Sequence, residues 1–233
     1  MQAVQGAGRP LSKWFVFGAL ALLSWSATAS EFSVGSVDVK FAEEGWQSLA
    51  LSDTKRPYGG DRVGALVVSS KVFWRDHAAS GGLVIVVVNA TNGGTGPGYM
   101  TYDRPCKSDD SIYREGNSGF SRSSKCLVVT PAYTANSVLK ELAPDLIALR
   151  DAGSLVVGTQ LFVILSRHAV ASGTDVEVQV FLSLPIATDA SALGQAVPQG
   201  VPPGHLVWGR ELMNAVSKSV HSISGRLAFP PIP

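Results

Sequence analysis

The chain has 233 residues, of which 45% are hydrophobic and 16% charged, and its formal net charge is +1. Because opposite charges nearly balance and form no long block of one sign, they predict neither a nucleic-acid partner nor binding to an anionic membrane surface. The length fits one domain whose hydrophobic core is large enough to fold without multiple disulfides or a structural metal.

The first thirty residues are typical of an export signal. Arg9 and Lys13 give a positive start, and residues 14–25 form an uncharged, largely apolar run. A transmembrane helix needs about 20 consecutive apolar residues, whereas polar side chains interrupt this run from Ser24 onward. The pattern therefore predicts a signal peptide over residues 1–29, with an uncleaved N-terminal anchor as the alternative.

A cleavage site follows the apolar run. Ala27 and Ala29 supply the small-x-small pattern that signal peptidase recognises, so we expect the mature chain to begin at Ser30. Cleavage would remove two of the 19 basic residues and none of the 18 acidic ones, leaving a formal net charge of −1. The mature chain is expected in the periplasm or outside the cell, and no integral membrane segment is predicted within it.

The two cysteines, Cys106 and Cys126, both lie in the predicted mature chain. Export would place them in an oxidising compartment, which predicts a disulfide bond between them. The bond would close a loop of about 20 residues and stabilise the fold by about 3 kcal/mol. A metal half-site or a reactive thiol is the alternative, but two cysteines without nearby histidines do not complete a tetrahedral zinc site.

The first half of the mature chain is predicted to consist of strands. Hydrophobic residues alternate over 37–41 and recur near 46–51, and a turn-rich loop is expected over 53–62. Residues 63–74 are predicted to be extended. The unbroken β-branched run Leu83–Asn89 is the strongest strand signal, and it predicts a central strand that is buried on both faces.

Helices enter the pattern in the second half. Residues 91–125 are rich in Gly, Ser, Asp and Arg, and a segment this long is expected to be partly structured or functional. A strand is predicted over 126–130 and a helical region over 134–152. Pro144 lies inside that region, so it predicts either a kinked helix or two short helices with Pro144 at the start of the second.

The last elements are a hairpin and a helix. Strands over 161–165 and 176–184 flank Gly173, which predicts a hairpin turn. An amphipathic helix is predicted over 205–224, before a Pro-rich tail. Its apolar stripe consists of Trp208, Leu212, Met213, Val216, Val220 and Ile223. Strands, helix, hairpin and helix without a βαβ rhythm predict one α+β domain over 30–233 with a mainly antiparallel sheet.

The sequence contains no strong catalytic signature. It has no Gly-x-Ser-x-Gly elbow and no pair of histidines at the helical spacing of a metal site. No catalytic residue, metal ligand or cofactor is therefore predicted. The alternative is a hydrolase whose triad forms only in the folded chain, drawing on His77 with Asp76 or on His168.

A candidate binding surface lies in and beside the loop 106–126 that the predicted disulfide would close. Its residues are Tyr99, Tyr102, Arg104, Tyr113, Arg114 and Phe120. Aromatic and arginine side chains are enriched in protein interfaces and sugar-binding sites, although these aromatics could instead anchor the segment to the core. The sequence favours an exported, non-enzymatic binding protein of the cell envelope, whose partner is an envelope protein, a small molecule or a glycan.

Overall fold

The computed structural model describes residues 31–58, 64–77, 82–91, 111–117, 123–153, 155, 157, 160–170, 173–183 and 203–233. The predicted signal peptide and its cleavage site, Ala27, Ala29 and Ser30, lie outside these residues. Within the described ranges the chain forms ten strands and three helices: β1 Glu31–Val34, β2 Val37–Phe41, β3 Gln47–Tyr58, β4 Gly64–His77, β5 Gly82–Thr91, β6 Tyr113–Asn117, β7 Ser123–Thr134, α1 Ala135–Leu142, α2 Asp145–Asp151, β8 Gln160–Val170, β9 Asp175–Ser183, α3 Pro203–His221 and β10 Arg226–Phe229.

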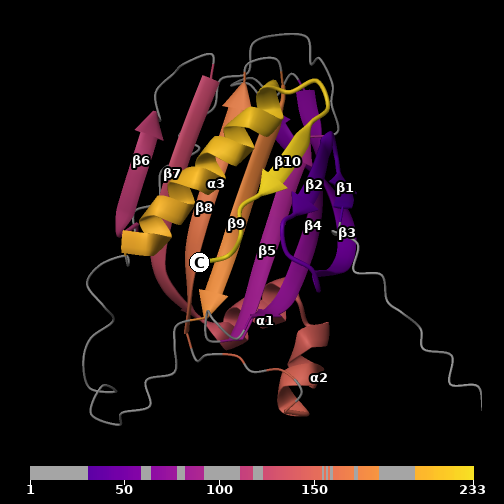
Figure 1. The fold of residues 1–233 in the computed structure, drawn as a ribbon. Coiled ribbons are helices and arrows are strands. Elements are labelled where there is room, and N and C mark those ends of the chain that lie inside the picture. Colours follow the sequence, from indigo (N-terminus) through magenta and orange to yellow (C-terminus); the bar gives the residue numbers. More distant parts are fainter. Residues whose placement is uncertain are drawn as a thin grey trace, which may run out of the picture.

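Seven of these strands form one antiparallel sheet in the order β3-β4-β5-β9-β8-β7-β6 (Figure 1). Every residue of β5 is buried, which confirms the prediction of a central strand over 83–89. The reason is that β5 has hydrogen-bonded neighbours on both sides and packed layers on both faces of the sheet. Such a strand takes an unbroken β-branched run because neither face meets water.

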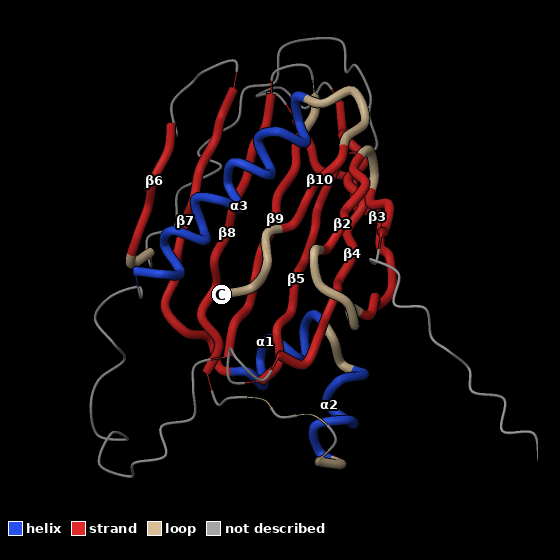
Figure 2. Tube along the Cα trace, in the orientation of Figure 1, coloured by secondary structure: helices blue, strands red, loops and turns tan. Residues whose placement is uncertain are grey.

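One face of this sheet is covered by α3 and by a small sheet of order β1-β2-β10 (Figure 1). β1 pairs antiparallel with β2, whereas β10 pairs parallel with β2 and brings the end of the chain back beside its first described strands. On the opposite face, α1 packs against one end of the large sheet, and α2 lies beyond the ends of the strands (Figure 2). The result is a single compact, sheet-rich body in which most strand pairs are antiparallel. None of the described helices is long and apolar enough to cross a membrane.

An aromatic cluster joins the small sheet to the large one. Phe41 of β2 stacks on Trp46 with ring centroids 4.2 Å apart. The same ring lies 5.2 Å from Phe73 of β4 and 5.0 Å from Phe229 of β10. Aromatic pairs of this kind contribute about 0.5–1.5 kcal/mol each beyond the burial of their area. The cluster therefore fixes how β2 and β10 pack on the large sheet.

The helical region 134–152 is divided at Pro144, as one of the two predicted alternatives proposed. α1 ends before Ala143, whose N–H donates to the carbonyl of Leu139, and α2 begins after Pro144. Proline has no N–H to donate to a preceding turn, but it is tolerated where a helix starts. Val138, Leu139 and Leu146 are the buried side chains that attach this pair of helices to the sheet.

The predicted loop over 53–62 is partly wrong. β3 continues to Tyr58 and pairs with β4 from Asp53 opposite Ser69 to Tyr58 opposite Gly64. The sequence indicated a turn because residues 53–58 are polar and include Pro57. β3 is the edge strand of the sheet, and an edge strand tolerates both polar residues and a proline that cannot donate to a neighbour.

The prediction for the last helix and tail is also partly wrong. α3 ends at His221, so Ile223 lies beyond the helix and is exposed rather than part of the buried stripe. Between the helix and the Pro-rich tail lies β10, which was not predicted because the strand has only four residues. The final residues are anchored too: Trp208 Nε1 donates to the carbonyl oxygen of Pro231 at 2.6 Å, and Ile232 is buried.

Gly225 makes the turn from α3 into β10, and we predict that alanine at this position strongly destabilises the fold. Its φ is +61°, and an added Cβ would lie 2.1 Å from the carbonyl oxygen of Ser36. Gly153 is a matched control, because its φ is +72° but nothing lies within 4 Å of the added carbon. Gly153→Ala should lower the free energy of unfolding by about 1–2 kcal/mol, and Gly225→Ala by clearly more, as measured by chemical denaturation. Equal losses of unfolding free energy in the two variants would contradict the prediction, because they would show that the backbone at Ser36 moves away from the added carbon at no energetic cost.

Candidate functional site

Two residues of the predicted binding surface, Tyr113 and Arg114, lie within the described chain. The other four lie outside it: Tyr99, Tyr102, Arg104 and Phe120. Tyr113 and Arg114 begin β6, which forms the edge of the large sheet opposite β3. The described part of the predicted surface therefore belongs to an edge strand.

Tyr113 and Arg114 point to opposite faces of the sheet. Tyr113 pairs with Val129, which belongs to the core beneath α3, whereas Arg114 pairs with Val128 on the other face. Successive residues of a strand alternate between faces, so neighbours in sequence separate in space. Tyr113 packs against the core, as the anchoring alternative expected, while Arg114 is exposed.

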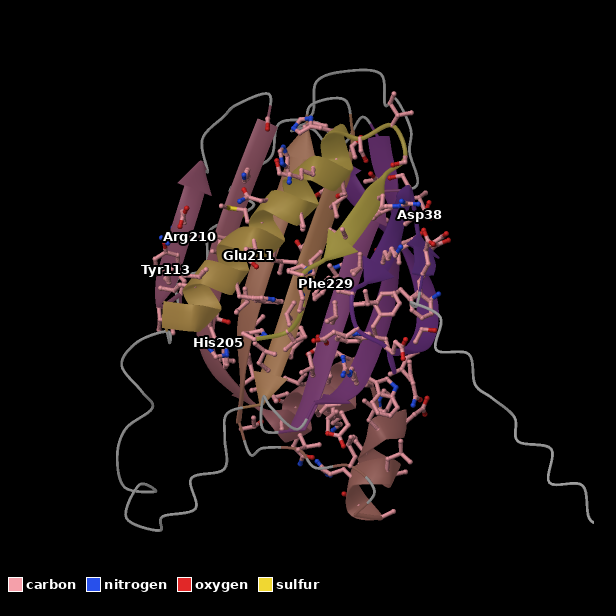
Figure 3. All side chains as sticks on the ribbon, in the orientation of Figure 1. Asp38, Tyr113, His205, Arg210, Glu211 and Phe229 are labelled. Atoms are coloured by element: carbon pink, nitrogen blue, oxygen red, sulfur yellow. The ribbon has the colours of Figure 1, made fainter. Side chains whose placement is uncertain are left out.

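Tyr113 takes part in a three-residue network that joins β6 to α3. Its hydroxyl donates to Glu115 Oε2 at 2.6 Å. Arg210 of α3 donates from Nε to the same carboxylate oxygen at 2.8 Å and from Nη2 to the tyrosine oxygen at 2.9 Å. Figure 3 shows Tyr113 and Arg210 side by side at this edge. We call Tyr113, Glu115 and Arg210 the edge network.

The charges of the edge network support one another. The hydrogen bond from Tyr113, followed by that from Arg210, lowers the pKa of Glu115 below its usual value. The hydrogen bond of Arg210 to Glu115, followed by its bond to Tyr113, raises the pKa of Arg210. Arg210 and Glu115 are solvent-accessible, so the network orients the edge strand more than it stabilises the whole fold. Sequence reasoning missed Arg210 because it lies far along the chain from β6.

Two exposed apolar side chains lie near the start of β6 and on α3. Ile112 immediately precedes β6 and is 47% exposed, and Val207 of α3 is 55% exposed. Val207 lies one helical turn before Arg210, so both side chains are on the same side of α3. Apolar groups beside arginine and tyrosine give this edge the mixture of side chains typical of protein interfaces.

Cys126 lies directly opposite Gly116 in the β6–β7 pair. Cys126 is buried and takes part in a disulfide bond. Its predicted partner, Cys106, lies outside the described residues, so the pairing of these two residues stays a prediction. A Cβ on Gly116 would lie 2.1 Å from the carbonyl oxygen of Lys125, and its φ is +116°. Glycine is therefore required for β6 to approach β7 closely at this point.

A second cluster lies beneath the C-terminal end of α3. His168 of β8 is only 3% exposed, and its Nε2 lies 3.0 Å from Ser123 Oγ of β7. The ring of His221, the last residue of α3, packs edge-on against it with centroids 4.9 Å apart. Burial lowers the pKa of His168 to about 4, with smaller contributions from the charges of His221 and Lys125, while Asp175 opposes the shift.

The Ser123–His168 pair bears on the hydrolase alternative. A catalytic histidine is held through its second ring nitrogen by a third group, usually a carboxylate. The Nδ1 atom of His168 is buried and has no hydrogen-bond partner. Asp175 cannot serve, because Arg167 holds its carboxylate on the opposite face of the sheet. Among the described residues, the pair therefore lacks an orienting acid.

His77, the other histidine of that alternative, ends β4, and its side chain lies outside the described part of the chain. Asp76 is exposed. Elsewhere, His205 of α3 packs edge-on against Phe162, and burial lowers the pKa of His205.

A buried polar row crosses the opposite face of the sheet. Asn89 of β5 donates from Nδ2 to Glu177 Oε1 of β9 at 3.0 Å. Arg167 of β8 donates two hydrogen bonds to the carboxylate of Asp175, and its Nη1 lies 3.8 Å from Glu177 Oε2. Glu177 is only 8% exposed although it alternates with the hydrophobic residues of β9, because β9 is a central strand. Each charge is paired, so the row favours one strand register over its slipped alternatives.

No group of three or more His, Cys, Asp or Glu side chains within the described ranges is placed to hold a metal ion. Comparison with known proteins found no family, no curated protein and no solved structure that matches this chain. The function must therefore be argued from the edge network and the histidine cluster.

The lowered pKa of His168 predicts that the fold loses stability in acid. The pKa of its side chain is 6.5 in the unfolded chain and about 4 in the folded one. As the pH falls, the unfolded chain therefore binds a proton at a higher pH than the folded chain does. The free energy of unfolding is highest above about pH 6.5 and decreases as the pH falls towards 4. The full loss is about 3 kcal/mol. Over this range the free energy of unfolding of wild type should fall relative to that of His168→Gln, which lacks the titrating group. Urea denaturation at each pH measures both values. A constant difference would contradict this assignment.

Proposed function

We propose that this chain is an exported, non-enzymatic binding protein of the cell envelope, folded as a single α+β domain. Its contact surface would consist of β6, the adjoining segment that the predicted disulfide closes, and the exposed side of α3 next to the edge network. The observation that carries this proposal is the attachment of β6 to α3 by Tyr113, Glu115 and Arg210.

Pre-organisation supports a binding role for this edge. The edge network fixes β6 against α3, so a partner that docks there would not have to order the strand. Ile112 and Val207 add exposed apolar area beside the charged groups. An interface of this kind combines an apolar centre with polar side chains at its rim. An envelope protein, a small molecule or a glycan remains the proposed class of partner.

Export is supported by the leader, in which a positive start and an apolar run precede the Ala27 and Ala29 pattern of a cleavage site. The disulfide bond of Cys126 fits an oxidising compartment. These observations favour the periplasm or the extracellular medium as the location of the mature domain.

The contact surface can be tested by site-specific photo-crosslinking in the cell envelope. A benzophenone amino acid at Ile112 or Val207 should capture a partner, because both side chains are exposed, one at the start of β6 and the other one helical turn before Arg210. Ile223 is the matched control, since it is an exposed apolar residue beyond the other end of α3. Arg210→Met should weaken capture, because it releases β6 from α3. Equal capture from all three positions, or from Ile223 alone, would contradict the proposed surface.

Processing can be tested by mass spectrometry of the intact protein recovered from the envelope fraction. We expect a chain that begins at Ser30 and weighs two hydrogens less than the reduced form, with Cys106 and Cys126 joined in one disulfide-linked peptide pair. Full-length protein in the cytosol with two free thiols would refute export.

A hydrolase remains the second candidate, favoured by the 3.0 Å contact between Ser123 Oγ and His168 Nε2. A serine beside a buried neutral imidazole is the arrangement in which the hydroxyl can be deprotonated as it attacks a carbonyl. Covalent labelling of Ser123 by a fluorophosphonate probe, lost in His168→Gln, would favour this candidate and overturn the non-enzymatic proposal. Ser123→Ala controls for labelling elsewhere.

A further inference from the structure

The large sheet ends in two edge strands, β6 on one side and the longer β3 on the other (Figure 1). Within the described residues, β3 is hydrogen-bonded to β4 alone. After a register shift between Ser48 and Leu51, this pairing is continuous from Leu51 to Tyr58. A long and regular edge presents a row of main-chain N–H and C=O groups to which another strand can add. The proposed contact surface, at β6, does not use this edge.

The end of the β3–β4 hairpin extends beyond the neighbouring strand. β4 pairs with β5 only from Val68 onward, where Val68 lies opposite Thr91. Among the described residues, positions 55–58 of β3 and 64–67 of β4 therefore pair only with one another. Val67, in this stretch, is 38% exposed. Two strands by themselves are marginally stable in water, so this hairpin arm, residues 55–58 and 64–67, would be stabilised by a third strand.

The charges of β3 are self-complementary about Thr54. Asp53 precedes this residue and Lys55 follows it. In an antiparallel pair of two β3 strands with a two-fold axis at Thr54, each Asp53 lies opposite Lys55 of the second copy. Residues directly opposite each other share a face, with Cβ atoms about 4.5–5.5 Å apart, and opposite charges attract there. Asp53 accepts a hydrogen bond from Ser69 Oγ at 2.6 Å and is nevertheless exposed, so its carboxylate is oriented and accessible.

Pro57 indicates which main-chain groups of β3 face outward. An edge strand tolerates proline where the missing N–H would point away from the sheet. Successive residues direct their N–H and C=O groups to alternate sides, so Asp53 and Lys55 present theirs on the same side as Pro57. These two residues can then exchange main-chain hydrogen bonds across the axis. At each end of the paired stretch, Pro57 cannot donate to Leu51 of the second copy, which leaves one hydrogen bond there in place of two.

We infer that two copies of this chain associate through β3, antiparallel and edge to edge about a two-fold axis at Thr54. The two large sheets then form one continuous sheet across both molecules. Residues 55–57 of each copy lie against residues 51–53 of the other, so the hairpin arm gains its third strand. Such a contact uses the same surface on both copies, which is the commonest symmetry of protein dimers. The two β6 edges remain at the far ends of the combined sheet.

Analytical ultracentrifugation of the mature chain tests this dimer by charge exchange. Wild type should show a monomer–dimer equilibrium. Asp53→Lys and Lys55→Asp each place like charges opposite one another twice per dimer, and each should raise the dissociation constant by about tenfold or more. A mixture of the two variants should associate again as a heterodimer, because both positions then face opposite charges. Lys140→Asp is the matched control, since Lys140 is exposed on α1 and its loss should leave the dissociation constant unchanged.

Cysteine crosslinking tests the register without altering a charge. Position 54 faces itself across the axis, so Thr54→Cys should give a disulfide-linked dimer under mild oxidation by copper phenanthroline. Ser52→Cys is the matched control, because position 52 would lie opposite Arg56 of the second copy and should not crosslink. The inferred dimer is overturned if wild type sediments as a monomer throughout, or if either charge variant associates like wild type. It is equally overturned if the mixed variants associate no better than each alone, or if positions 52 and 54 crosslink equally.

Discussion

The packing of α3 against β7 and β8 is the contact on which the rest of the structure depends. Gly209 has no side chain at the point of closest approach, where an added carbon would lie 3.1 Å from Leu127 and 3.5 Å from Ile164. This small residue lets the helix lie close on the sheet while Leu212 and Val216 are buried beneath it. The helix then brings Arg210, two turns from its start, to β6, and His221, its last residue, to β8.

The same helix leads the chain back to its first described strands. After α3 the chain turns through Gly225, and β10 adds to β2 beside the N-terminal hairpin. The ring of Phe229 joins the aromatic cluster around Phe41, and Trp208 holds the carbonyl of Pro231. The first and last described segments thus share one small sheet. Its burial stabilises the fold only when both segments are in place, so no local part of the chain can form it alone. This long-range pairing explains why β10 carried no signal of its own.

The candidate sites differ in how far the sequence could reveal them. Tyr113 and Arg114 were found from composition, because aromatic and arginine side chains stand out in a polar segment. Their separation onto opposite faces was not foreseeable without knowing that residues 113–117 form a strand. Arg210, Ser123 and His221 gave no signal, since each acquires a role only from a neighbour on another element.

The sequence alone determined the local features: the buried run of β5, the division of the helical region at Pro144, the hairpin at Gly173 and the amphipathic stripe of α3. These depend on periodicity and on the backbone properties of proline and glycine, which act over a few residues. Only the tertiary structure decided that β3 extends through Pro57, that Glu177 is buried and that His168 meets His221. Strand order and helix placement set these outcomes, because they determine which residues distant in sequence share a solvent-free interior.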